Sequence, residues 1–78
     1  MELRQRRLLL ARDLLRIIER RAIMMELEVT FREGGRHSII TVGSSISIIP
    51  RHREIHPGTV DAIMKDLEPV FGKRWLKQ

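Results

Sequence analysis

Apolar side chains recur at helical spacing through the first part of the chain. Arginines fill most of the positions between them. A period of three to four residues is typical of a helix with one buried face. The pattern therefore predicts an amphipathic helix from Leu3 to Ala22. Its apolar stripe consists of Leu8, Leu10, Ala11, Leu14, Leu15, Ile17, Ile18 and Ala22.

The pattern then changes to the two-residue period of a β-sheet. From Glu26 to Arg32 apolar and polar residues alternate strictly, which is typical of a half-buried strand. Gly34-Gly35 suits a two-residue hairpin loop, and His37 to Val42 follows as a second strand. The loop Gly43-Ser44-Ser45 then leads into a third strand, Ile46 to Ile49.

A second helix is predicted from Pro57, because proline is favoured in the first helical turn. Pro69 is expected to end or kink this helix. Val70 to Leu76 then forms a short extra turn, from which Phe71 and Trp75 pack back onto the core. The apolar stripe of the second helix is Val60, Ile63, Met64 and Leu67.

These elements predict one small α+β domain over residues 1–78, with Val70 to Gln78 as a C-terminal extension. The order α-β-β-β-α is most simply built as a three-stranded antiparallel sheet with both helices on one face.

Strand register determines which side chains share a face of this sheet. With the Gly-Gly loop as the turn, Arg32 lies opposite His37. With the Gly-Ser-Ser loop as the second turn, Ile40 lies opposite Ile48. A one-residue slip of the third strand would place Ser47 in the core, so we favour the first register.

This register predicts a row of polar residues across the outer, open face of the sheet. His37 lies opposite Arg51, and Arg32, His37 and Arg51 form the row. The same register puts Ile39 opposite Ile49 on the outer face. Two facing, exposed isoleucines are either a protein contact or a scattered apolar pair.

Composition narrows the classes of partner and chemistry. The net charge is +5, which is common in small domains that bind nucleic acid, acidic proteins or anionic lipid. No cysteine is present, so disulfides, thiolate chemistry and cysteine zinc sites are excluded and a reducing cytoplasm is expected. The sequence has no apolar run long enough to span a membrane and no spacing typical of a metal or cofactor site, and we expect no signal peptide because the basic start lacks an apolar block and a cleavage site.

The most strongly basic corner precedes the second helix. Arg51, His52 and Arg53 lie in a short loop, and Gly58 and Thr59 follow at the helix N-terminus. Free backbone N–H groups and the partial positive charge of a helix start attract phosphate, and arginine adds bidentate donors. We expect an anion site here.

His37 is the strongest candidate for catalysis. An imidazole exchanges protons near neutral pH, and RNA cleavage needs proton transfer together with stabilisation of charge at phosphorus. An isolated histidine on a strand is more often surface decoration. His52 and His56 are candidates for a second acid or base. Alternatively, His56 has only a local structural role as the residue before the second helix.

The residues quoted so far resemble the HicA toxin family. Members of this family are small cytoplasmic mRNA interferases of toxin–antitoxin modules, with a fold like the double-stranded-RNA-binding domain. The matching segments are 32–37 (Arg-Glu-Gly-Gly-Arg-His), 48–55 (Ile-Ile-Pro-Arg-His-Arg-Glu-Ile) and 57–67 (Pro-Gly-Thr-Val-Asp-Ala-Ile-Met-Lys-Asp-Leu).

The resemblance implies roles for single residues. The catalytic histidine of the family maps onto His37, after Gly35, and a HicB-type antitoxin is implied as the partner that covers it. We hypothesise that His37 acts as general acid or base on mRNA without metal or cofactor. Arg32 and Arg51 would then hold phosphate.

Two further arginines are assigned to RNA binding, and two departures from the family stand out. Arg36 and Arg53 help to bind RNA in this hypothesis, although Arg36 stands where the family often has serine. The Arg-rich first helix is longer than usual.

The alternatives are a non-catalytic RNA-binding module of the same fold and an interaction domain whose first helix binds an acidic protein.

Overall fold

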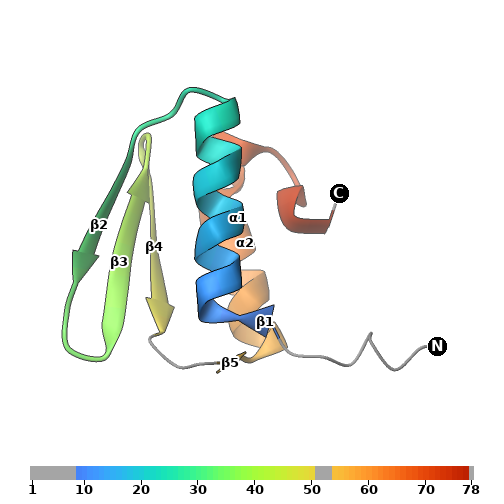
Figure 1. The fold of residues 1–78 in the computed structure, drawn as a ribbon. Coiled ribbons are helices and arrows are strands. Elements are labelled where there is room, and N and C mark those ends of the chain that lie inside the picture. The colour runs from blue at the N-terminus through green and yellow to red at the C-terminus, as the bar shows by residue number, and fades with distance from the viewer. Residues whose placement is uncertain (1–8, 51–53, 78) are drawn as a thin grey trace.

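The protein was analysed as a computed structural model, which describes residues 9–50 and 54–77. Two helices and a three-stranded sheet make up most of it (Figure 1). In chain order the elements are β1 (Leu9–Leu10), α1 (Ala11–Met24), β2 (Val29–Glu33), β3 (His37–Val42), β4 (Ser45–Pro50), β5 (Glu54–Ile55), α2 (Pro57–Phe71) and the 3₁₀ helix η2 (Trp75–Lys77).

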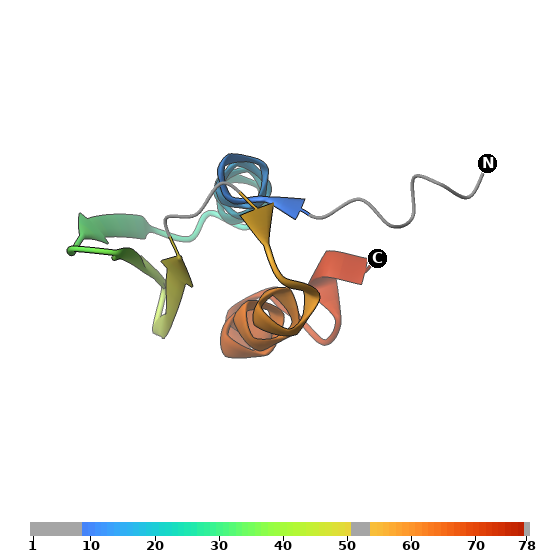
Figure 2. The same ribbon diagram turned by 90° about the horizontal axis from the view of Figure 1, so that it is seen from below.

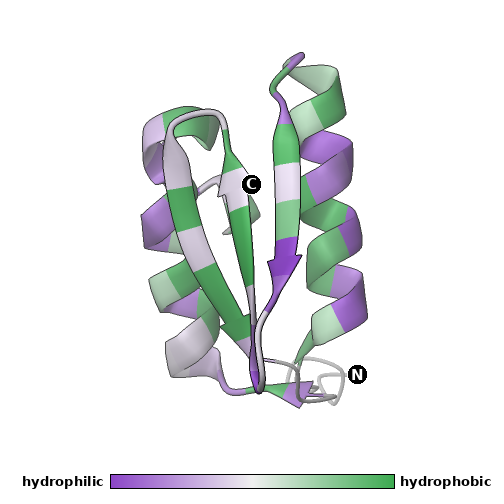
Figure 3. Cartoon of the chain, turned by 90° about the vertical axis from the view of Figure 1, so that its left-hand side faces the viewer, coloured by the Kyte–Doolittle hydropathy of each residue, from purple (hydrophilic) through white to green (hydrophobic). Residues whose placement is uncertain are grey.

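The main sheet has the antiparallel order β2-β3-β4. Both helices pack on the same face of it, as the view along the layers shows (Figure 2). The opposite face of the sheet is open (Figure 3). The predicted α+β class, with three antiparallel strands and two helices on one face, is therefore confirmed.

The first helix begins later than its apolar stripe indicates. Leu9 and Leu10 form the short strand β1, which pairs with Ile55 and Glu54 of β5, and α1 starts only at Ala11. The predicted start at Leu3 lies outside the described residues. Leu9 and Leu10 fit the helical spacing, but their backbone pairs with β5, a strand far along the chain. No local sequence pattern indicates such a pairing.

The β2–β3 hairpin differs by two residues from the predicted register. Arg32 lies opposite Ile39, not opposite His37. The Gly34 N–H donates to the His37 carbonyl over 2.9 Å, which closes a longer loop. Neither Gly34 nor Gly35 has the positive φ that a two-residue primed turn demands of its central residues. A shift of two keeps the side-chain faces, so the inner face of β2 was predicted correctly.

The β3–β4 hairpin differs by one residue from the predicted register, which is therefore wrong. Ile40 lies opposite Ser47, and Ile39 lies opposite Ile48. The loop consists of two residues with Gly43 first, and its φ of +58° suits a position where a type II′ turn requires glycine. The predicted outward position of Ile49 is wrong, since Ile49 is 1% exposed.

Serine is accepted on the inner face because its hydroxyl has a partner. Ser47 is 1% exposed, and its hydroxyl donates to Asp66 Oδ2 of α2 over 2.9 Å. A buried hydroxyl with a hydrogen bond carries little desolvation penalty. The exchange leaves Ile46 and Ile48 on the open face, with 59% and 54% of their surface exposed.

The second helix and the tail follow the predicted start but not the predicted end. Helix α2 begins at Pro57 and continues past Pro69 to Phe71. Pro69 falls in the last turn, where its missing N–H removes a single intrahelical bond. Trp75 then packs back onto the core as expected. Its ring makes an edge contact with Phe71, with the ring centroids 4.9 Å apart, and its indole N–H donates to the Met64 carbonyl over 2.8 Å.

The core lies between the two helices and the inner face of the sheet. It draws on α1, on strands β3, β4 and β5, on α2 and on η2, so that every layer contributes. Its buried members are Leu14, Ile18, Ala22, Ile40, Val42, Ile49, Ile55, Ile63, Met64, Leu67, Phe71 and Trp75.

Candidate functional site

His37 is the first residue of β3, and its side chain is exposed. Ser38, the next residue, is buried, so alternation along the strand places His37 on the open face. It lies opposite Pro50, the last residue of β4. His37 is therefore accessible to a large ligand that lies across the sheet.

Arg32 shares the open face with His37 but does not lie opposite it. Arg32 pairs with Ile39, which places His37 on the diagonal of that pair. Diagonal neighbours in a sheet are about 7–8 Å apart, within the reach of a long side chain. Arg32 and His37 can therefore contact one ligand, although the predicted straight row is wrong.

The other members of the predicted row and loop divide into two groups. Arg51, His52 and Arg53 lie outside the described residues. Arg36 lies in the β2–β3 loop, next to His37, and is exposed. Arg36 therefore lies at the same end of the sheet as His37.

The N-terminus of α2 is built as predicted. His56 is the N-cap residue with extended dihedral angles and no side-chain cap, and Pro57 is the first helical residue. The first helical hydrogen bond of this turn runs from the Val60 N–H to the His56 carbonyl over 2.9 Å. Gly58 and Thr59 thus occupy the helix positions whose N–H groups have no partner within a helix.

The helix start and His37 lie at the same end of the molecule. In Figure 1 the start of β3, the end of β4 and the start of α2 are all at the lower end. They belong to different layers, because α2 packs behind the sheet and His37 faces the open side. A ligand that contacts both has to wrap around the end of β4.

The open face also carries a stripe of isoleucines. Ile39 and Ile48 face each other, and Ile46 lies two positions from Ile48 on the same face. This stripe lies at the centre of the open face. His37 lies on the same face of β3, two residues before Ile39. The polar end and the apolar centre together form one continuous surface.

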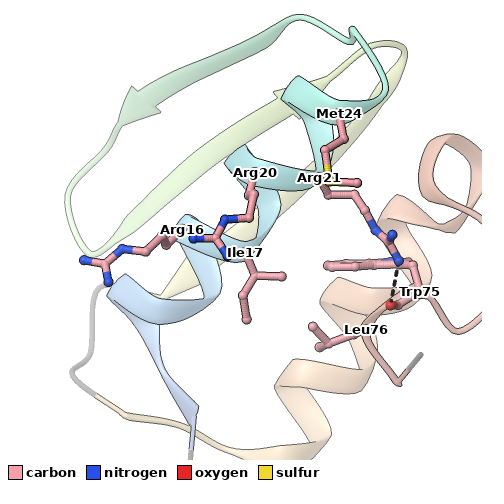
Figure 4. Close-up of a pocket in the computed structure, with 7 residues that line it drawn as sticks. All are labelled: Arg16, Ile17, Arg20, Arg21, Met24, Trp75 and Leu76. Carbon is pink, nitrogen blue, oxygen red and sulfur yellow. Dashed lines mark hydrogen bonds between the residues drawn. The ribbon is translucent and has the colours of Figure 1, made fainter.

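A groove that the sequence does not indicate lies between α1 and the C-terminal tail (Figure 4). Its volume is about 390 Å³. The sequence pattern predicts Ile17 in the buried stripe of the first helix, but Ile17 is 39% exposed and lines this groove. Only docking of the tail creates it, so no local pattern predicts it. The lining residues are Arg16, Ile17, Arg20, Arg21, Met24, Trp75 and Leu76.

Comparison with known proteins adds no identity. No family model, curated protein or solved structure matches this chain. Within residues 9–50 and 54–77, no group of three or more His, Cys, Asp or Glu side chains is arranged to hold a metal ion. Neither described helix has the length and apolar character needed to cross a membrane.

Proposed function

We propose that this protein is an endoribonuclease of the HicA type, the toxin of a toxin–antitoxin module, which cleaves mRNA without a metal ion. The observation that carries the proposal is the position of His37. It is exposed at one end of an open sheet face, with Arg32 on the same face and Arg36 beside it. The fold would be that of the double-stranded-RNA-binding domain, in a cytoplasmic protein.

The chemistry assigned to His37 is proton transfer. The 2′-hydroxyl of RNA loses its proton to a base and attacks the adjacent phosphorus. The P–O5′ bond breaks, and the leaving 5′-oxygen takes up a proton from an acid. The products are a 2′,3′-cyclic phosphate and a 5′-hydroxyl. His37 would serve one of these two steps, and Arg32 would stabilise the negative charge that develops on the phosphate oxygens.

The implied partner is a HicB-type antitoxin that covers the open face. The isoleucine stripe supports this part of the proposal. Ile46 and Ile48 are more than half exposed beside the half-buried Ile39, and exposed apolar side chains in a contiguous group mark interaction surfaces. A partner bound there would also block access to His37.

Inducible expression tests the proposed activity in cells. Wild-type protein is expected to arrest growth and to shorten the lifetime of mRNA, and His37→Ala is expected to do neither at equal protein level. Lys65→Gln is the comparison variant, because it changes an exposed residue of α2 that has no part in the proposed site. If His37→Ala remains as toxic as the wild type, the assignment of His37 is wrong.

A non-catalytic RNA-binding module of the same fold is the second candidate. The exposure of Arg32 and Arg36 at one end of the sheet supports binding, whether or not cleavage follows. Backbone-directed binding weakens steeply with salt. RNA that is retained at low salt, released at high salt and recovered intact over a range of pH values would favour this candidate.

A further inference from the structure

The groove between α1 and η2 combines guanidinium groups with an aliphatic surface. Arg16, Arg20 and Arg21 come from α1, and none of the lining residues is acidic. Ile17 lies between Arg16 and Arg20 along α1, and Met24 lies one turn past Arg20; the two apolar side chains remain 39% and 71% exposed. A ligand that fits this surface carries negative charge around an apolar group.

The arginines of the groove are held in two different ways. Arg21 Nη2 donates to the Trp75 carbonyl over 3.1 Å, which ties the tail to the helix (Figure 4). Arg16 and Arg20 are exposed and lie one helical turn apart. Two like charges at this spacing destabilise a helix. An anion between them would relieve the repulsion and gain charge-assisted hydrogen bonds.

The only tryptophan of the chain lies in this groove but offers no stacking surface to a base. Trp75 is 2% exposed, and its indole N–H is bonded to the Met64 carbonyl. Proteins that bind single-stranded RNA commonly stack bases on accessible aromatic rings. The accessible floor here is aliphatic, which favours a peptide over a nucleic acid.

The shape of the groove also fits a peptide. Its lining runs from Arg16 to Met24 along α1, a length of about 12 Å at the rise of an α-helix. This length accommodates a short segment with two apolar side chains on successive turns. Met24 suits such contacts, because an unbranched thioether adapts to varied partners.

We propose that this groove binds an acidic, amphipathic peptide segment of another protein, in which carboxylates contact Arg16 and Arg20 and an apolar anchor packs on Ile17 and Met24. The site lies on α1 and the tail, apart from His37 and Arg32. It is therefore independent of the proposed ribonuclease, and its failure would leave that proposal unchanged.

Fluorescence anisotropy with a labelled synthetic peptide tests the proposal. The probe carries two leucines one helical turn apart between glutamates. One control peptide replaces the leucines with serines, and another replaces the glutamates with lysines. A single-stranded RNA oligonucleotide is measured in parallel. We expect the full-length protein to bind the first peptide, and both control peptides to bind at least about tenfold more weakly.

Matched variants locate the binding. Arg20→Gln is expected to weaken the peptide about tenfold, whereas Lys65→Gln removes one positive charge from the exposed side of α2 and changes little. Met24→Gln is expected to weaken it severalfold. Ile23→Gln changes another exposed apolar residue near the end of α1, outside the groove, and serves as its control.

Three results would overturn the proposal. The first is equal weakening by Arg20→Gln and Lys65→Gln, which would mean that overall charge alone attracts the peptide. The second is equal affinity for the leucine and serine peptides, which would exclude an apolar contact. The third is RNA binding that depends on Arg20 in the absence of peptide binding, which would assign the groove to nucleic acid. Circular dichroism of each variant checks that it is folded.

Discussion

The hydroxyl of Ser47 donates a hydrogen bond to Asp66 Oδ2 across 2.9 Å and so ties the edge strand β4 to helix α2. This bond satisfies a hydroxyl that the register of β4 turns into the core. The same register turns Ile46 and Ile48 out onto the open face. The register that buries Ser47 beside Asp66 therefore also places two exposed isoleucines on the face that carries His37.

The first prediction concerns the Ser47–Asp66 hydrogen bond. Ser47→Ala is expected to lower the free energy of unfolding by about 1 kcal/mol, because Asp66 is exposed and regains water when its partner is lost. Urea denaturation measures the change. Asp66→Ala, alone and combined with Ser47→Ala, gives the coupling energy of the pair, because alanine removes the acceptor. Asp61→Ala, at another exposed acid of α2, is the control, and additive effects of the Ser47 and Asp66 changes would contradict the contact.

The second prediction tests the register of β4 with two neighbouring isoleucines. Ile49→Ala is expected to lower the free energy of unfolding by about 2–5 kcal/mol, because it leaves a cavity in the core. Ile48→Ala is expected to cost less than about 1 kcal/mol, since Ile48 is more than half exposed. The alternative register reverses the two effects, so the larger loss at Ile48 would show that the register is wrong.

The third prediction concerns the turn between β3 and β4. Gly43 has a φ of +58°, and an added Cβ would lie 3.4 Å from Val70 Cγ1. Gly43→Ala is expected to lower the free energy of unfolding by about 1–2 kcal/mol through the left-handed backbone alone. Gly35→Ala is the control: its Cβ would meet nothing within 4 Å, and its φ is not in the left-handed region. Thermal unfolding of the two variants is compared, and equal stability would contradict the turn geometry.

The fourth prediction concerns the tail. Trp75→Ala is expected to lower the free energy of unfolding by about 3–5 kcal/mol, a large part of the stability of a domain of this size. It removes a buried ring, the edge contact with Phe71 and the hydrogen bond to Met64. Trp75→Phe keeps most of the volume and isolates the loss of the N–H donor. A fully stable Trp75→Ala protein would mean that the tail is not docked as described.

Local sequence signals predicted the elements more reliably than their pairing. The bounds of β3 and the start of α2 at Pro57 are as predicted, because alternation and proline at the first turn are local properties. The register failed at Ser47. The rule that apolar residues face inward excluded the register that buries Ser47. Nothing near Ser47 in the sequence shows that Asp66 of α2 supplies an acceptor for its hydroxyl.

The candidate site was predicted in part for a related reason. The exposure of His37 and the helix N-terminus at Gly58 depend on short segments, and the sequence indicated both. The predicted straight row of Arg32, His37 and Arg51 depended on the register and is wrong, because Arg32 lies opposite Ile39 and His37 lies opposite Pro50. The groove on α1 needs a tail that folds back from the far end of the chain.

The central claim is that His37 transfers a proton during RNA cleavage, and the most direct measurement is cleavage of end-labelled RNA by purified protein in the presence of a metal chelator. We expect the wild-type protein to produce fragments with 2′,3′-cyclic phosphate and 5′-hydroxyl ends, and His37→Ala to lower the rate by at least about 100-fold. Arg32→Gln should weaken cleavage less, because it retains the proton-transfer group. Intact RNA after incubation with wild-type protein, or equal cleavage by His37→Ala, would contradict the account.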